Sequence, residues 1–342
     1  MTCSFCHNEG TPVAAAYSSG DIMLPNPKYR GGRVSVFESH NGVDFIPGTM
    51  QPNQTFIETL EILTQMLDTK ELHLTGGEPT LHRRLPELID MATSHGLSVK
   101  LTSNGENSRV FRECAAAGLK KVNFSIFGTT PEELAEVQHE KYRDTKRAEK
   151  KIASLKESID EALRYGIKVD ANIVMPDYSH ADRVFRIIND YDERVSVRIL
   201  NDIDMGDSSY LAIYQLMADL NATPQELRVE AGSSNSRVAY KLPSGRTIFF
   251  KQIRRTTLPK TCGTCSMNND KDCKEGFYGI RVYLDTDDNY RIGVCIQRMD
   301  LTTKIGDFIA GDLLNEINEL RSNEQMRLHE QYNNRLTREE RI

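Results

Sequence analysis

The hydrophobic and polar positions between residues 52 and 220 follow two alternating periods. Short apolar runs, each ending in a polar or glycine-rich turn, predict five strands at 71–77, 97–105, 120–128, 167–176 and 196–202. Apolar residues spaced three and four apart predict helices around them, at 52–68, 85–96, 108–118, 131–165, 181–191 and 210–220. Strands and helices that alternate in this way predict an α/β fold with a parallel sheet.

The helix predicted at 52–68 has no obvious strand before it. A right-handed βαβ crossover expects a strand ahead of its helix. Residues 11–53 are rich in glycine, proline and serine and do not supply one. We therefore expect that the first strand of the sheet is missing from this chain.

The pattern changes after about residue 226. Residues 237–255 alternate around the turn PSG, and residues 278–295 alternate around DTDDN, so both segments predict β-hairpins. A charged helix is predicted at 311–331. We expect three parts: 1–225 as the parallel α/β part, 226–310 as a small domain, and 311–342 as a C-terminal helix and tail.

Composition and charge narrow the class of protein. The chain has 342 residues, 39% of them hydrophobic and 27% charged, which is typical of a globular protein. It contains no apolar run of the roughly 20 residues that a membrane span needs, and no visible signal peptide. The net charge of -6 argues against nucleic acid as a bulk partner. We expect a cytoplasmic protein with no membrane partner, and the charge does not exclude a small anionic substrate bound in a local pocket.

Six of the seven cysteines are clustered in sequence. Cys114 stands alone in a predicted helix, so we expect a buried core thiol there. In a reducing compartment clustered cysteines favour metal binding over disulfides. The C-terminal set has the spacing C-x2-C-x7-C-x21-C, and four thiolates suit either zinc or an iron–sulfur cluster. Spacing alone leaves both open. The set is Cys262, Cys265, Cys273 and Cys295.

Polar residues gather where the predicted strands end. The turn LTGGEPTLH follows the first strand, and its Glu78 could pair with the ammonium group of a ligand. The turn TSNG follows the second strand. Parallel strands of one barrel direct such residues toward one cavity at their carboxyl ends. The other candidates on strands are Asn123, Ser125, Asn172 and Arg198.

The start of the chain, MTCSFCHNEG, combined with the later GGEP, resembles the radical SAM superfamily. That family's signature is C-x3-C-x-aromatic-C, and its three thiolates hold a [4Fe–4S] cluster that binds S-adenosylmethionine. Cys3, Phe5 and Cys6 match the last part of this signature. The resemblance implies a partial (β/α)6 TIM-type barrel. It also implies that a 5′-deoxyadenosyl radical, made by reductive cleavage of S-adenosylmethionine, abstracts hydrogen from a substrate.

The resemblance also implies which residues bind the cofactors. Cys3 and Cys6 are expected to be ligands of the first cluster. The residues expected to contact S-adenosylmethionine are Phe5, Gly76, Gly77, Glu78, Pro79, Ser103, Asn104, Ser125, Asn172 and Arg198. No residue is assigned to the catalytic hydrogen transfer. An electron donor such as flavodoxin or ferredoxin is the expected protein partner.

The first cysteine of the signature would lie four positions before Cys3, ahead of Met1. We therefore expect that this chain starts at an internal methionine, inside the cluster motif. The same start would remove the missing first strand. We expect a chain of this length to be impaired in catalysis, because two thiolates hold a cluster less securely than three. A cysteine codon upstream, in frame, would confirm this expectation.

Within the superfamily the chain most resembles the GTP 3′,8-cyclase-like (MoaA-like) group, whose barrel is followed by a twitch/SPASM-type domain with a second, auxiliary [4Fe–4S] cluster. That group uses three cysteines in its second site, whereas Cys273 is a fourth candidate here. Four ligands would leave no iron open for GTP. The expected substrate is a nucleotide- or nucleoside-like small molecule. The alternatives are a peptide maturase of the same superfamily and a non-catalytic zinc or iron–sulfur binding protein.

Overall fold

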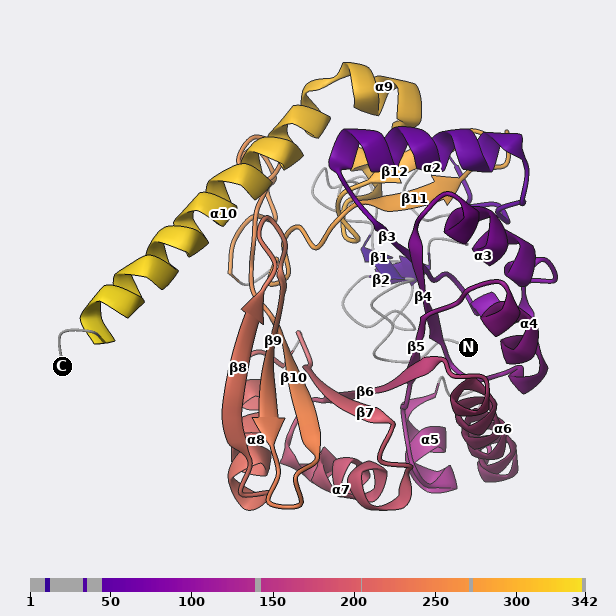
Figure 1. Cartoon of the computed structure of the whole chain (residues 1–342), viewed down its shortest axis with the longest axis vertical. Helices are drawn as coiled ribbons and strands as arrows, with labels where there is room; N and C mark the ends of the chain where they lie inside the picture. Colours follow the sequence, from indigo (N-terminus) through magenta and orange to yellow (C-terminus); the bar gives the residue numbers. More distant parts are fainter. Residues whose placement is uncertain are drawn as a thin grey trace. The chain divides into compact units, whose positions relative to one another are not determined.

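The computed structural model describes residues 45–138, 143–203, 205–270 and 273–339, with two short strands at 10–12 and 33–35 (Figure 1). The chain forms two compact units. The first, here called the barrel unit, comprises the described residues within Met50–Leu227 and Arg237–Gln252. The second, here called the cysteine unit, comprises Gly10–Thr49, Arg228–Ser236 and Ile253–Ile342.

The barrel unit is built on a curved sheet with the strand order β3-β4-β5-β6-β7-β10-β9-β8. The strands are β3 (Glu71–Leu74), β4 (Ser98–Ser103), β5 (Lys121–Ser125), β6 (Lys168–Met175), β7 (Ser196–Asn201), β8 (Thr223–Val229), β9 (Asn235–Lys241) and β10 (Thr247–Ile253). Strands β3 to β7 pair in parallel, as the sequence predicts. The α/β class and the largely parallel sheet are therefore confirmed.

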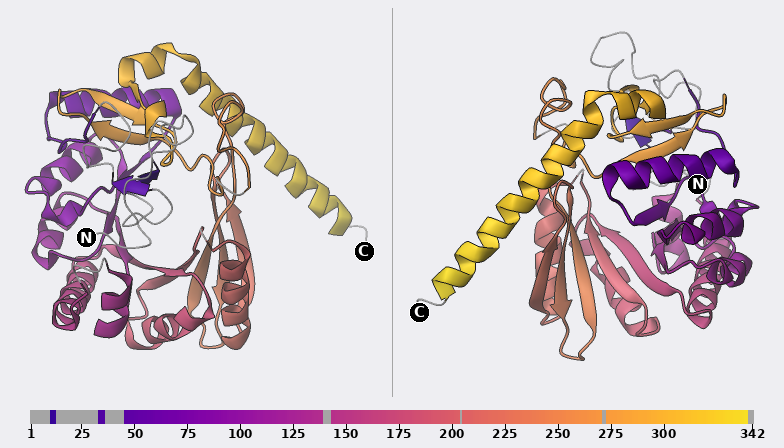
Figure 2. Two further views of the ribbon diagram at one scale, coloured as in Figure 1. Left: turned by 180° about the vertical axis from the view of Figure 1, so that it is seen from behind. Right: turned by 45° about the horizontal axis from the view of Figure 1, so that its top comes forward.

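Helices cover the outer side of this sheet (Figures 1 and 2). They are α2 (Gln54–Leu67), α3 (Leu85–Ser94), α4 (Phe111–Ala116), α5 (Pro131–Val137), α6 (Thr145–Arg164), α7 (Ala181–Asp190) and α8 (Asp207–Asp219). The helix predicted over 131–165 is two helices. The second begins after Asp144, whose side chain accepts a hydrogen bond from the backbone of Arg147 and so provides an N-cap.

The two faces of the sheet differ in polarity. In β4, Val99 and Leu101 are fully buried, and Lys100 between them is only half-buried. In β7, Val197 and Ile199 are fully buried on either side of Arg198. Because side chains alternate along a strand, the apolar set faces the helices and the polar set faces the concave side. The concave face is thus available for a polar site.

The first predicted hairpin joins the large sheet. Strand β10 pairs in parallel with β7, with Ile248 opposite Val197 and Lys251 opposite Leu200. This register places 237–252 in the barrel unit, whereas we expected the hairpin in the small domain.

Strand β8 was not anticipated either, because its sequence TPQELRV has few apolar residues. The boundaries expected at 225 and 310 remain predictions.

The cysteine unit contains a three-stranded antiparallel sheet. Its strands are β11 (Arg281–Leu284), β12 (Tyr290–Gly293) and β13 (Thr303–Lys304). Strands β11 and β12 form the second predicted hairpin. A separate pair joins β1 (Gly10–Pro12) to β2 (Arg33–Ser35). The helices are α9 (Ile305–Ala310) and α10 (Asp312–Glu339). Within the described ranges, no helix has an apolar stretch long enough to cross a bilayer.

Helix α10 is attached to its unit by the carboxylate of Glu324. Arg254 donates two hydrogen bonds to it, at 2.7 and 2.8 Å, and the backbone nitrogen of Gly232 donates a third at 2.7 Å. These bonds, chiefly those from Arg254, lower the pKa of Glu324 to about 2. The ionised carboxylate is therefore bound more strongly by the folded unit than by the unfolded chain.

This pKa predicts a pH-dependent stability. In the unfolded chain a glutamate titrates near ~4.3, so the stabilisation is complete above that pH and is lost as the pH falls toward about 2. We expect the free energy of unfolding to fall by ~1–2 kcal/mol through this group between pH 6 and pH 3. Urea unfolding of Glu324→Gln should lose this part of the pH dependence, whereas Glu319→Gln, at an exposed position of α10, should retain it. Equal pH dependence in both variants would contradict the assignment.

Candidate functional site

The turn after β3 carries residues 76–79, the GGEP sequence. Gly76 has a φ of +144°, in a region that favours glycine, and no atom of the described residues lies within 4 Å of the position that a Cβ would take. The backbone here is therefore open to close approach by a ligand. Pro79 begins a short 3-10 helix, Pro79–Leu81, which ends the turn.

Glu78 ties this turn to the end of β4. Its Oε1 accepts hydrogen bonds from the backbone nitrogen of Thr80 at 3.0 Å, from the Thr80 hydroxyl at 2.5 Å and from the Ser103 hydroxyl at 2.7 Å. Its Oε2 accepts one from the backbone nitrogen of Asn104 at 2.7 Å. The expected partner of a ligand ammonium is thus also the link between two strand-end turns. Ser103 is buried and supports the turn through Glu78 and Gly105.

Ion pairs and hydrogen bonds cross the concave face of the sheet. The carboxylate of Asp170 on β6 lies 2.5 Å from Nζ of Lys121 on β5 and 3.0 Å from Nη1 of Arg198 on β7. Arg198 also donates to the Oδ1 of Asn123 at 3.1 Å. At the edge of the sheet, Lys100 on β4 pairs with Glu71 on β3. The charges on this face are therefore largely fixed by their neighbours.

His73 on β3 extends this network. Its Nε2 lies 2.7 Å from the hydroxyl of Thr102 and 3.5 Å from the amide nitrogen of Asn123. Burial by the surrounding protein, and then the positive charges of Lys251, Lys100 and Arg198, lower the pKa of His73 to about 4. The imidazole is therefore neutral at physiological pH and can act as a hydrogen-bond partner.

Two residues of this face carry buried polar atoms that lack a hydrogen-bond partner among the described residues. They are the Oδ1 of Asn172 on β6 and the Nε of Arg198 on β7. A buried polar atom without a partner is costly, so such atoms often mark where a ligand binds. Both residues were predicted to contact S-adenosylmethionine. An acceptor and a donor on neighbouring strands fit a polar ligand of that kind.

A cavity of about 240 Å³ lies at the ends of β4 and β5. Asn104 and Ser125, both predicted cofactor contacts, line it together with three cations of α6: Arg147, Lys150 and Lys151. The sequence did not reveal these cations, because the charged stretch that contains them looks like the solvated face of a helix. The one feature of the sequence that points to these cations is their position in the helix immediately before β6. A ligand carboxylate or phosphate suits this positive wall.

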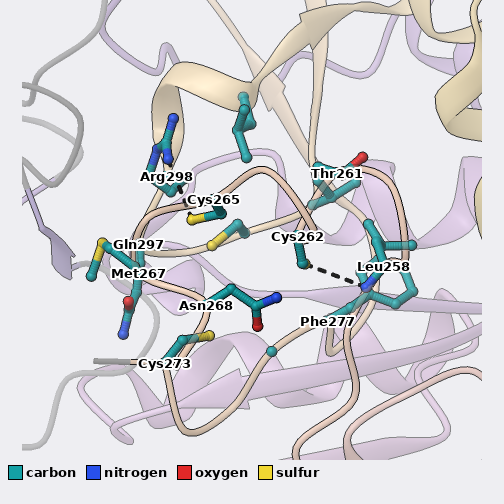
Figure 3. A pocket seen from close by; sticks show the side chains of 14 residues that line it. Leu258, Thr261, Cys262, Cys265, Met267, Asn268, Cys273, Phe277, Gln297 and Arg298 are labelled. Carbon is teal, nitrogen blue, oxygen red and sulfur yellow. Dashed lines mark hydrogen bonds between the residues drawn. The ribbon is translucent and has the colours of Figure 1, made fainter. Parts of the chain in front are cut away.

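In the cysteine unit, Cys262, Cys265, Cys273 and Cys295 line one pocket. Figure 3 labels the first three of them. Burial raises the pKa of the Cys295 thiol to about 12 and also raises that of Cys262. Within the described ranges, however, no three His, Cys, Asp or Glu side chains converge closely enough to hold a metal ion. The donor set fits an iron–sulfur cluster or zinc in its chemistry, and ligation requires these thiols to move together and lose their protons.

Two further residues hold the loop that carries the first two of these cysteines. The buried carboxylate of Glu316 on α10 accepts hydrogen bonds from the backbone nitrogens of Lys260 and Thr261 and from the Thr261 hydroxyl. From the opposite side, Arg298 donates to the Cys265 sulfur at 3.4 Å (Figure 3). Sequence reasoning missed both residues, because each acts across the fold on a distant segment.

The structure thus brings some of the predicted residues together, and other predicted residues lie outside the part of the chain that it describes. Residues 76–79, Ser103 and Asn104 meet at the ends of β3 and β4, and Asn172 and Arg198 are neighbours on β6 and β7. Cys114 is fully buried, as expected, and burial raises its pKa to about 12. Cys3, Phe5 and Cys6 lie outside the described residues, so the first cluster site and the expected internal start remain predictions.

Relatives of known function share part of this sequence. A probable GTP 3′,8-cyclase of Metallosphaera sedula is 26% identical over 202 residues, covering 58% of this chain and 61% of the relative. The GTP 3′,8-cyclase of Nautilia profundicola is 30% identical over 138 residues, covering 38% and 40% of the two chains. That of Brucella ovis is 27% identical over 195 residues, covering 50% and 54%. The chain therefore spans about two fifths to three fifths of these curated relatives.

A solved structure with loose similarity is that of Streptococcus suis SuiB bound to S-adenosylmethionine. It has a TM-score of 0.35 and 12% sequence identity, and the match covers 51% of this chain and 44% of SuiB. The family model of the radical SAM superfamily matches residues 1–185, which is more than half of the chain. This match includes the cysteines near the start, the GGEP turn and strands β3 to β6. The chain belongs to the radical SAM superfamily.

Proposed function

We propose that this protein is an enzyme that cleaves S-adenosylmethionine reductively and acts on a nucleotide- or nucleoside-like small molecule. The observation that carries the proposal is the GGEP turn, which is open at Gly76 and held by Glu78 against the end of β4. The GGEP turn lies within residues 1–185, which match the family model of the radical SAM superfamily. When bound, the [4Fe–4S] cluster and S-adenosylmethionine supply a one-electron cleavage that gives methionine and a 5′-deoxyadenosyl radical able to remove hydrogen from a substrate.

The residues of the chain bind and orient the cofactor. Cys3 and Cys6 are the proposed cluster ligands, with Phe5 between them. The backbone of Gly76 and Gly77 and the carboxylate of Glu78 receive the methionine ammonium group. Among the described residues, the Oε2 of Glu78 accepts one hydrogen bond, from the backbone nitrogen of Asn104 at 2.7 Å, so a second donor can still be accommodated there.

Other residues fit the remaining groups of the same ligand. Arg147 and Lys150 supply positive charge for its carboxylate, at the cavity that Asn104 and Ser125 also line. Asn172 offers an acceptor and Arg198 a donor on the concave face. Asp170 and Asn123 fix the position of the Arg198 guanidinium, because both accept a hydrogen bond from its Nη1.

A second [4Fe–4S] cluster is proposed for the cysteine unit, with Cys262, Cys265, Cys273 and Cys295 as ligands. The support is that all four thiols line one pocket. Four protein ligands would leave no iron free for substrate, so an electron-transfer or structural role suits this cluster better than direct substrate binding. This arrangement differs from the cyclase-like group, so GTP itself is not the proposed substrate.

The substrate class rests on the relatives, whose names state that they act on GTP. We propose a nucleotide- or nucleoside-derived substrate for this chain on that basis. A reductant of the flavodoxin or ferredoxin type would supply the electron, and a cytoplasmic location suits both the thiols and this donor.

Metal analysis and cofactor binding test the proposal. We expect the full gene product, purified without oxygen, to hold about eight irons and about eight sulfides, and to bind S-adenosylmethionine in equilibrium dialysis. The double variant Cys262→Ser, Cys265→Ser should retain about half the iron and still bind S-adenosylmethionine. Zinc in place of iron at both sites, or no binding of S-adenosylmethionine by the iron-loaded protein, would contradict the proposal.

A further inference from the structure

The cysteine pocket has a fixed cation on one wall. Arg298 lines the pocket, and its guanidinium is oriented by the carboxylate of Asp300. The Nε of Arg298 donates to both oxygens of Asp300, at 2.8 and 3.1 Å, and Nη2 donates to one of them at 2.6 Å. The Nη1 is left to point at the sulfur of Cys265, 3.4 Å away (Figure 3). The side chain of Arg298 is only 18% exposed.

This geometry makes the contact between Arg298 and Cys265 preorganised. A guanidinium already held by bidentate hydrogen bonds to a carboxylate loses little further conformational entropy when it donates to a second group. Asp300 lies only two residues from Arg298 in the same short 3-10 helix region, Met299–Leu301, so the pair does not depend on distant segments. The direction of Nη1 toward the sulfur is thus built into the local fold.

Resting on the proposed second cluster, we infer that Arg298 is a positioning residue that sets the reduction potential of that cluster through Cys265. A [4Fe–4S] cluster with four thiolates carries a charge of about -2 when oxidised and about -3 after it accepts one electron from an external reductant. No bond to the protein forms or breaks in this step. A positive charge and a hydrogen bond at one sulfur stabilise the more negative state, and low exposure strengthens the effect. Arg298 therefore makes the cluster easier to reduce.

The alternative role for Arg298 is purely structural, because it could simply hold the loop that contains Cys265. A structural role would change how much cluster the protein holds. A role in setting the potential would change the potential of the cluster that is held. The two can be separated by measuring both quantities on the same protein.

The test uses the full gene product with Cys3→Ala and Cys6→Ala, so that the remaining iron belongs to the cysteine unit. Its midpoint potential is measured by anaerobic titration with titanium citrate, followed by electron paramagnetic resonance. In this background Arg298→Ala should lower the equilibrium constant for reduction about tenfold, which is about 59 mV for one electron. Arg298→Lys should restore most of the shift, because it keeps the charge. Arg327→Ala, which removes an exposed cation of α10, should leave the potential unchanged.

The outcomes separate the inference from the proposal beneath it. An unchanged potential in Arg298→Ala, with normal iron content, would overturn the inference and leave the second cluster standing. Loss of cluster in both Arg298→Ala and Arg298→Lys would also overturn it, in favour of a structural role. Absence of iron from the background protein, or its replacement by zinc, would refute the second cluster itself.

Discussion

Replacing Glu78 by glutamine is expected to reduce the release of 5′-deoxyadenosine at least 100-fold. The carboxylate accepts four hydrogen bonds, two from Thr80 in its own turn and two from Ser103 and Asn104 at the end of β4. A glutamine amide would place an NH2 group against the backbone N–H of Asn104 or against the Thr80 and Ser103 donors, so at least one contact becomes donor against donor. Hydrogen bonds to a charged group contribute ~1.5–3 kcal/mol each, and the charge that attracts the ligand ammonium is lost as well.

The matched control for this variant is Glu87→Gln, nine residues further along. Glu87 is an exposed residue of α3 whose carboxylate pairs with Arg84. Loss of a solvent-exposed pair of this kind has little effect on stability and should leave 5′-deoxyadenosine release within twofold of the wild type. Affinity for S-adenosylmethionine, measured by equilibrium dialysis, should fall at least tenfold in Glu78→Gln only. Wild-type affinity and release rate in Glu78→Gln would show that this turn does not hold the cofactor.

Gly276→Ala is expected to disrupt the cysteine unit. Gly276 lines the cysteine pocket and has a φ of +71°, which side-chain-bearing residues rarely adopt. A Cβ at this position would overlap the carbonyl oxygen of Thr256 and come within 2.8 Å of its carbonyl carbon. The neighbouring backbone cannot move away freely, because the nitrogen of Phe277 donates to that same carbonyl oxygen at 2.5 Å. We expect a loss of more than ~3 kcal/mol in the stability of the unit.

Gly306→Ala provides the control in the same unit. Gly306 lies in α9, and no atom of the part of the chain that the structure describes is within 4 Å of the position a Cβ would take there. Alanine in a helix is favoured over glycine by ~0.5–1 kcal/mol, so this variant should be as stable as the wild type or slightly more stable. Iron content after anaerobic purification should fall by about half in Gly276→Ala, because the proposed second cluster would be lost, and should be unchanged in Gly306→Ala. Full iron content and unchanged urea unfolding in Gly276→Ala would refute this prediction.

The parallel part of the fold was predictable from the sequence because its signal is local. Each of the strands β3 to β7 is an apolar run followed by a turn and then a helix, so short windows are sufficient to identify it. The pairing of β10 with β7 could not be predicted in this way. It joins residues about fifty positions apart, and nothing in the hairpin sequence distinguishes a place in the large sheet from a place in a small domain.

The candidate site was predictable only where a residue acts within its own turn. Glu78 and Asn104 were found because GGEP and TSNG are recognisable strand-end turns. The role of Asp170 was missed, because its partners Lys121 and Arg198 come from two other strands and meet only in the folded sheet. Arg298 was missed for a similar reason, since its target Cys265 is 33 residues earlier in the chain.

The most direct test of the proposed function is the release of 5′-deoxyadenosine and methionine from S-adenosylmethionine. The full gene product, loaded with iron and sulfide without oxygen and reduced with dithionite, should release the two products in equal amounts. Release should be lost when Cys3 and Cys6 are both replaced by alanine. Failure of the iron-loaded, reduced protein to release either product, under conditions where it binds S-adenosylmethionine, would contradict a radical enzyme and favour a non-catalytic binding protein.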